Sequence, residues 1–276
     1  MKIGLLLTFF CLCLLQLSAQ PSFLVKKEGK GKRSILFIPG FSCSGDVWKE
    51  TVKDYAKEYT CHVLTMPGFA GAPAEATPQL QNWVTEIAAY IRAQNLEKPI
   101  VVGHSIGGVM TLLLAARYPD LIGRIVVVDA LPCLGAIMNP AFKPVANPDC
   151  GPFISRFTKM SDSAFYQMQK MVVRGMMTDT LHAAEVIHWG VLSNRETLGR
   201  IYCQFSNLDM RDSLATITCP ALVLLEASFA GMKPAIEAQY HGLRTGTLSY
   251  ADKGLHFIMY DDKQWYDGQL AHFIKQ

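Results

Sequence analysis

Short apolar runs alternate with segments of helical periodicity along most of the chain. Between the runs, apolar residues recur every three or four positions, as at Leu80, Trp83 and Ile87. The first four runs cover residues 35–38, 62–66, 99–103 and 125–128. An alternation of this kind predicts a mostly parallel sheet whose strands are joined by flanking helices.

Three helices are expected between these runs. Apolar and aromatic residues at helical spacing mark the first, namely Trp48, Val52, Tyr55 and Tyr59. The dipeptide Thr77-Pro78 predicts the start of the second, because it offers a cap residue followed by proline at the first helical position. The third is expected to follow residue 106 and to end near Tyr118.

The alternation is interrupted between about Pro132 and Asp212, where helical patterns occur without any strand-like run. Strand-like runs then return at residues 221–225 and 247–250. A helical segment of this length between two strands predicts a cap over one edge of the sheet. We therefore expect a core of residues 20–132 and 213–276 and a helical cap of residues 133–212.

The composition is that of a globular protein without an unusual charge. Half of the 276 residues are hydrophobic and the formal net charge is +3, which is too small to indicate a nucleic-acid partner. The one basic cluster comprises Lys26, Lys27, Lys30, Lys32 and Arg33. We interpret this cluster as the solvated end of a strand.

The first residues have the pattern of a secretory signal peptide. Lys2 precedes an apolar run over residues 3–17, and Ser18 and Ala19 are small residues suited to cleavage. We predict a signal peptide of residues 1–19 and an exported protein, periplasmic or extracellular. No later apolar segment is long enough to anchor the processed chain in a membrane.

Six cysteines follow the predicted signal peptide, and their spacing matches no zinc site. An exported location permits disulfides. Cys133 and Cys150 flank a proline-containing loop and are the first candidate pair. The other cysteines, which are Cys43, Cys61, Cys203 and Cys219, are expected to be free and buried.

The pentapeptide at residues 103–107, Gly-His-Ser-Ile-Gly, fits the G-x-S-x-G nucleophile elbow. An apolar run precedes it and a helix start rich in small residues follows. In such a turn the serine hydroxyl points out of the sheet, while glycine is needed where side chains would collide with neighbouring elements. Ser105 is therefore the candidate nucleophile, and His104 is interpreted as structural.

Four segments together make the chain resemble the α/β-hydrolase family, from about residue 34 to the C-terminal end. They are Ile38-Pro39-Gly40-Phe41, Pro67-Gly68-Phe69-Ala70-Gly71, Gly103-His104-Ser105-Ile106-Gly107-Gly108 and Ala251-Asp252-Lys253-Gly254-Leu255-His256-Phe257. The resemblance is closest to bacterial carboxylesterase-like members with a helical cap. It implies the α/β-hydrolase fold, a mostly parallel sheet with flanking helices and an inserted cap.

The resemblance also implies the partners of Ser105. His256 follows the last predicted strand, where the family places its general base. The usual site of the acid, four residues after residue 225, holds Phe229. Two carboxylates remain as candidates for the triad acid: Asp129, which ends a buried strand and is favoured, and Glu226.

Two backbone amides are expected to form the oxyanion hole, and no metal or cofactor is expected. One amide belongs to Ile106, directly after the nucleophile, and the other to Phe41, in the loop after the first core strand. These residues predict a serine hydrolase that cleaves a small carboxylic ester through an acyl-serine intermediate. Hydrolysis of an amide, peptide or lactone and a non-catalytic ligand-binding role remain alternatives, and the oligomeric state is left open.

Overall fold

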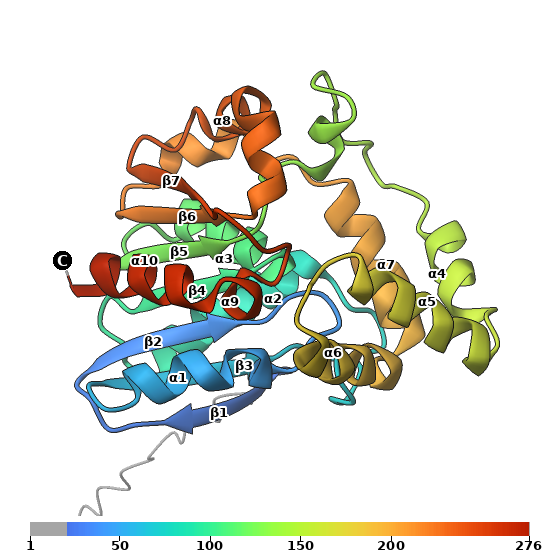
Figure 1. Cartoon of the computed structure of the whole chain (residues 1–276), viewed down its shortest axis with the longest axis horizontal. Helices are drawn as coiled ribbons and strands as arrows, with labels where there is room; N and C mark the ends of the chain where they lie inside the picture. Colours follow the sequence, from blue (N-terminus) through green and yellow to red (C-terminus); the bar gives the residue numbers. More distant parts are fainter. Residues whose placement is uncertain (1–20, 276) are drawn as a thin grey trace, which may run out of the picture.

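A central sheet of seven strands organises the computed structural model, which describes residues 21–275 (Figure 1). The strands are β1 (Leu24–Glu28), β2 (Arg33–Ile38), β3 (Tyr59–Thr65), β4 (Ile100–His104), β5 (Arg124–Val128), β6 (Ala221–Leu225) and β7 (Gly246–Tyr250). Their order across the sheet is β1-β3-β2-β4-β5-β6-β7. Only β1 is antiparallel to its neighbour, so the predicted mostly parallel sheet is confirmed.

Helices cover both faces of the sheet, which explains why its inner strands are continuously apolar. In β2, Ile35 and Phe37 point to one face, and Leu36 and Ile38 point to the other. The first face packs against α1 (Lys49–Tyr55), α9 (Ile258–Asp261) and α10 (Lys263–Lys275). The second packs against α2 (Leu80–Ala93), α3 (Ile106–Arg117) and α8 (Lys233–Tyr240).

Two local expectations about the first helices were wrong. Tyr59 does not continue α1 but begins β3, where it pairs with Arg33 of β2. Helix α2 begins at Leu80, after Gln79, and not at the Thr77-Pro78 dipeptide. Its first amide, on Leu80, is bound instead by the side chain of Gln204, which also donates to the carbonyl oxygen of Pro78.

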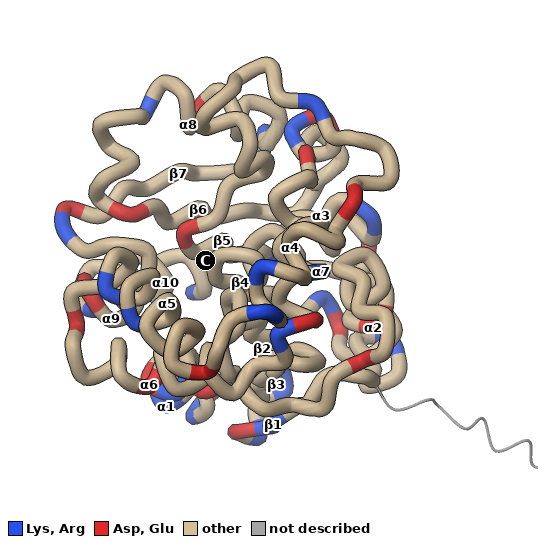
Figure 2. Tube along the Cα trace, turned by 90° about the vertical axis from the view of Figure 1, so that its right-hand side faces the viewer, with Lys and Arg blue, Asp and Glu red and all other residues tan. Residues whose placement is uncertain are grey.

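Four helices lie between β5 and β6, at the side of the sheet where the strands end (Figure 1). They are α4 (Gly151–Thr158), α5 (Asp162–Arg174), α6 (Thr180–Leu192) and α7 (Arg195–Ser206), which we call the cap helices. Short 3-10 turns at Leu134–Ile137 and Asp212–Thr216 flank them. Lysines and arginines are dispersed over the core and the cap helices (Figure 2).

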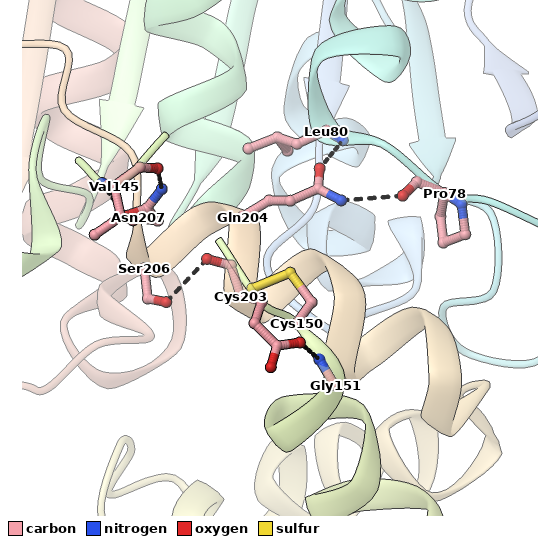
Figure 3. The surroundings of a disulfide bond; sticks show 10 residues. Pro78, Leu80, Val145, Cys150, Gly151, Cys203, Gln204, Ser206 and Asn207 are labelled. Atoms are coloured by element: carbon pink, nitrogen blue, oxygen red, sulfur yellow. Dashed lines mark hydrogen bonds between the residues drawn. A yellow bond between two sulfur atoms is a disulfide. The ribbon is translucent and has the colours of Figure 1, made fainter. Parts of the chain in front are cut away.

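The cap helices contain a disulfide between Cys150, directly before α4, and Cys203 in α7 (Figure 3). The expected Cys133–Cys150 pair is therefore wrong, as is the expectation of a free Cys203. Cys133 is buried below the start of the insertion, where its amide is held by Gln239 of α8, whereas Cys150 packs with α4 against α7. The remaining free cysteines in the described structure are Cys43, Cys61 and Cys219, all buried.

The predicted signal peptide, residues 1–19, lies outside the described residues. Among residues 21–275, no helix combines the length and apolar character required to span a bilayer.

Candidate active site

The predicted site residues follow four neighbouring strands at one edge of the sheet. Phe41 comes after β2, Ser105 after β4, Asp129 after β5 and Glu226 after β6. Because these strands are parallel neighbours, their carboxyl ends lie side by side, which is where α/β proteins place their ligands. His256 joins them from the loop between β7 and α9.

Ser105 occupies a sharp turn between β4 and α3, with φ 55° and ψ −122°. A non-glycine residue rarely adopts a positive φ, so the surrounding structure must hold this turn in place. Its amide donates to the carbonyl oxygen of Val128 at 2.9 Å. A Cβ on Gly103 would overlap the Gly107 carbonyl, and one on Gly107 would lie 2.5 Å from the Pro39 carbonyl oxygen. Both glycines of the pentapeptide are thus sterically required.

Asp129 is buried and has two defined partners. Its Oδ2 lies 2.6 Å from Nδ1 of His256, and its Oδ1 accepts the backbone N–H of Glu226 at 2.7 Å. The amide of Asp129 donates to Leu224 of β6, and its φ is 48°. A buried carboxylate is costly without partners, and these contacts supply them. The structure therefore brings Asp129 and His256 together.

Glu226 occupies a different position. Its carboxylate accepts a hydrogen bond from the hydroxyl of Ser228, and its backbone N–H donates to Asp129. Burial raises the pKa of the Glu226 carboxyl, and the nearby Asp129 carboxylate raises it further. The contact with Nδ1 of His256 belongs to Asp129, and Glu226 borders the pair.

Asp129, Glu226 and His256 also place one potential metal-binding atom each within 4.8 Å of one another, the one such group among the described residues. Both Asp129 oxygens already accept hydrogen bonds from protein groups. The Nδ1 atom of His256 is engaged by the same carboxylate. This donor set fits a hydrogen-bonded pair of Asp129 and His256 better than a cation site.

His104 contributes a contact that the sequence did not reveal. Its Nε2 lies 2.9 Å from the carbonyl oxygen of His256, and the two rings are 4.6 Å apart between centroids. Burial lowers the pKa of His104 well below its usual value, and the proximity of His256 lowers it further. The neutral ring donates from Nε2 and so fixes the backbone that carries His256.

Asp261 is a second residue that the sequence analysis missed. Its carboxylate accepts the amide of Leu255, next to His256, at 3.0 Å. It also accepts the amides of Thr178 and Asp179, between α5 and α6, at 2.9 Å each. One carboxylate thus ties the histidine loop to the cap helices. No pattern in the sequence links these three segments.

The loop after β2 is shaped around His104. A Cβ on Gly40 would lie 2.6 Å from Nδ1 of His104, so glycine is required there. The ring of Phe41 packs edge-on against Phe69 and Tyr202, at centroid distances of 5.4 and 5.9 Å. Ile106 is the first residue of α3, where backbone amides lack an acceptor within the helix. Both candidate oxyanion donors therefore lie beside Ser105.

A cavity of about 330 Å³ contains Ser105 and His256 in its wall. Core residues of this wall are Phe41, Ser42, Cys43, His104, Ser105, His256 and Phe257. Cap-helix residues are Phe153, Arg156, Phe157, Met168, Gln169, Met171, Val172, Val173, Met176, Val186 and Tyr202. Its volume suits a small ligand, and most of the wall is apolar.

Comparison with known proteins gives a consistent result. Residues 33–156 match the family described as the alpha/beta hydrolase fold. A pimeloyl-[acyl-carrier protein] methyl ester esterase from Vibrio atlanticus is 25% identical over 71% of this chain and 76% of its own. The corresponding esterase from Aeromonas hydrophila is 22% identical over 91% of this chain and 98% of its own.

Solved structures share the fold over nearly the whole chain. The enol-lactonase from Burkholderia xenovorans superposes with a TM-score of 0.75 at 13% identity, covering 92% of this chain and 96% of that one. An esterase from Exiguobacterium antarcticum gives the same TM-score at 14% identity, with the same coverage. Together with the sheet topology and the sequence match, these findings show that the chain has the alpha/beta hydrolase fold.

Proposed function

We propose that this hydrolase cleaves a carboxylic ester through an acyl intermediate on Ser105. The observation that carries the proposal is the 2.6 Å contact between His256 and the buried Asp129, in the same cavity wall as the strained Ser105. A carboxylate on Nδ1 leaves Nε2 of the imidazole to act as a base toward a serine hydroxyl. The ester chemistry is supported by the named activity of the sequence relatives.

The proposed reaction has two matching halves. Nε2 of His256 takes the proton from Ser105 Oγ while Oγ bonds to the ester carbonyl carbon, and the amides of Phe41 and Ile106 bind the developing oxyanion. The bond to the alcohol oxygen then breaks, and the alcohol leaves with the proton held by His256. A water molecule next attacks the acyl-serine by the same route, which releases the acid and restores the serine.

We also propose that the protein works outside the cytoplasm. The basic and apolar pattern of the first residues supports export. The Cys150–Cys203 disulfide is compatible with an oxidising compartment. Intact-mass measurement of protein recovered from the medium or periplasm tests this part. A soluble product that still contains residues 1–19 would contradict it.

The catalytic proposal is tested with Ser105→Ala. We expect kcat on a p-nitrophenyl ester to fall by about a millionfold, because the variant lacks the nucleophile, and labelling by a fluorophosphonate to disappear. Ser163→Ala, on the exposed face of α5, is the matched control and should keep both. A Ser105→Ala enzyme with more than about a tenth of the activity would overturn the assignment, and an unlabelled wild-type protein would favour a non-catalytic binding role.

A further inference from the structure

Gln169 of α5 is a polar side chain buried in the wall of the catalytic cavity. It is only 6% exposed, and its side-chain amide forms no hydrogen bond with any described residue. Neither amide atom is among the fully buried side-chain atoms that lack a partner, so the amide is open to the cavity. The same wall contains apolar side chains such as Met168, Val172 and Val186, and none of its polar side chains is hydrogen-bonded to Gln169. The partner of this amide therefore comes from the contents of the cavity, either water or a bound ligand.

Helix α6 has a glycine where it faces this amide. Gly190 of α6 faces Gln169, and a Cβ at residue 190 would lie 2.5 Å from Oε1 of Gln169. Any other residue there would force the amide to move. A glycine inside a helix costs stability relative to alanine, so the close approach of Gln169 gives it a structural reason.

The charge of the cavity points to the chemistry of the partner. Among the described residues that line the cavity, Arg156 of α4 is the only lysine or arginine, and none is an aspartate or glutamate. Arg156 is exposed, at the outer part of this wall. Arg156 forms no ion pair with a described residue. Both Arg156 and Gln169 come from the cap helices, whereas Ser105 and His256 come from the core. The cation and the free amide therefore belong to the side of the cavity wall that does not carry the nucleophile.

We propose that the substrate is a monoester of a dicarboxylic acid, whose free carboxylate is held by the amide N–H of Gln169 and by the guanidinium of Arg156. This inference rests on the proposed ester hydrolysis at Ser105 and names its substrate class. A carboxylate accepts hydrogen bonds from both groups and satisfies the charge and the buried amide together. A cavity of about 330 Å³ lies at the small end of ligand sites, which suits a short diacid monoester.

The test compares pairs of methyl esters of equal chain length. Monomethyl esters of dicarboxylic acids with four to eight carbons are set against methyl esters of the matching monocarboxylic acids. We expect kcat/KM of the wild type to favour the dicarboxylate member by about tenfold or more at one chain length. Gln169→Leu should reduce this preference by about tenfold, mainly through KM, because a hydrogen bond to a charged group is lost. Arg156→Gln should reduce it severalfold, and added salt should weaken the preference in the wild type.

Matched controls separate recognition from structure. Gln167→Leu repeats the glutamine-to-leucine change at an exposed position of α5. Arg174→Gln repeats the arginine-to-glutamine change outside the catalytic cavity. Both should retain the wild-type preference. If Gln169→Leu does not fold, Gln169→Glu keeps the shape, repels a carboxylate and should shift the preference toward the half-amide of the same acid.

The two proposals can fail separately. A wild type that cleaves both members of every pair equally well, or a Gln169→Leu variant with an unchanged preference, would overturn the dicarboxylate assignment and leave ester hydrolysis intact. Absence of both ester cleavage and fluorophosphonate labelling would instead overturn the proposed function on which it rests.

Discussion

The core and the cap helices contribute different kinds of side chains to the cavity. At the sheet edge, Ser105, Asp129 and His256 are held by backbone hydrogen bonds and by glycines that admit no substitute. The cap helices supply most of the cavity wall. Together with the loop before α4 and the turn after α5, they carry nine of the eleven exposed large apolar side chains among residues 21–275. These nine are Met138, Val145, Tyr166, Met171, Val172, Met176, Leu181, Val191 and Leu192.

This difference separates reaction from recognition. Geometry fixed at the ends of parallel strands suits the proposed reaction, which needs the same few atoms in the same positions for any substrate. A wall of methionine, valine and phenylalanine on short helices can change its shape at small cost, which suits the selection of a substrate. Variants in the core should therefore alter kcat, and variants in the cap should alter stability or preference.

The largest effect is expected from Asp129, the proposed triad acid in the core. Asp129→Asn removes the charge that stabilises the imidazolium and can favour the wrong tautomer of His256. We expect kcat to fall by about four powers of ten, the cost of this change in a well-studied triad. Glu226→Gln should cost about tenfold or less, because its side chain contacts Ser228 and not His256. Rates on one activated ester, with circular dichroism to verify folding, decide between the two.

The opposite result would transfer the role of the acid. A dead Glu226→Gln enzyme beside a nearly normal Asp129→Asn enzyme would mean that His256 changes its partner during the reaction. Two mildly affected variants would mean that Ser105 and His256 act without a carboxylate.

The second prediction concerns the disulfide of the cap helices. The bond closes a segment with a sequence separation of 53 residues, so chain entropy assigns it about 4 kcal/mol of the free energy of unfolding. The double variant Cys150→Ser with Cys203→Ser should lose about that amount in urea unfolding. Reducing agent should destabilise the wild type and leave the double variant unchanged. Equal sensitivity of both proteins to reducing agent would contradict the assignment.

Sequence patterns were sufficient for the inner sheet and insufficient at its border. Strands buried on both faces are mostly apolar, and the runs Ile100–Val102 of β4 and Ile125–Val128 of β5 show this directly. Strand β1 has the sequence Leu-Val-Lys-Lys-Glu, and its exposed lysines are typical of an edge strand that avoids further pairing. Its apolar signal is too weak to recognise, and only the pairing with β3 reveals it.

At the candidate site, too, local sequence motifs predict single residues but not the contacts between distant segments. The position of Ser105 follows from a local motif, because the glycines needed for its turn are adjacent in sequence. The choice between Asp129 and Glu226 depends on how two loops after neighbouring strands meet, which no local pattern encodes. The Cys150–Cys203 bond joins helices whose packing the sequence did not predict.

The third prediction tests how the core tolerates a buried histidine. His62 of β3 is 2% exposed, and burial lowers its pKa to about 4, with a smaller contribution from Lys27 on β1. The native state keeps the ring neutral below pH 6.5, whereas the unfolded chain takes up a proton. Above pH 6.5 the ring is neutral in both states and His62 does not lower the free energy of unfolding. As the pH falls from 6.5 toward 4, protonation of the unfolded chain lowers this free energy progressively.

This pH dependence is measurable by urea unfolding at pH 7 and pH 5. The contribution of His62 to the loss of stability is about 2 kcal/mol over this interval. His62→Gln should remove that part of the loss, while His188→Gln, at an exposed position of α6, should not. An unchanged pH dependence in His62→Gln would show that His62 does not contribute, and the loss would then belong to the other buried histidine, His104.

The smallest effect is expected where the core and the cap helices meet. Gln204 of α7 accepts the amide of Leu80 at 2.8 Å and donates to the carbonyl oxygen of Pro78 at 3.1 Å (Figure 3). Gln204→Leu keeps the size of the side chain and removes both hydrogen bonds. Two unpaired backbone groups should cost about 1–2 kcal/mol in the free energy of unfolding, because the site is partly open to water.

Gln167→Leu, an exposed position of α5, is the matched control and should change stability by less than about 0.5 kcal/mol. Hydrogen exchange at the Leu80 amide locates the effect. If Gln204 caps α2 from the cap helices, exchange at this amide should speed up in Gln204→Leu while amides of the inner strands stay protected. Unchanged exchange would mean that the first turn of α2 is stable without Gln204. The contact would then serve only to position α7 against the core. Faster exchange would show that the core depends on the cap helices for the end of one of its own helices, so the division between the two regions is not complete.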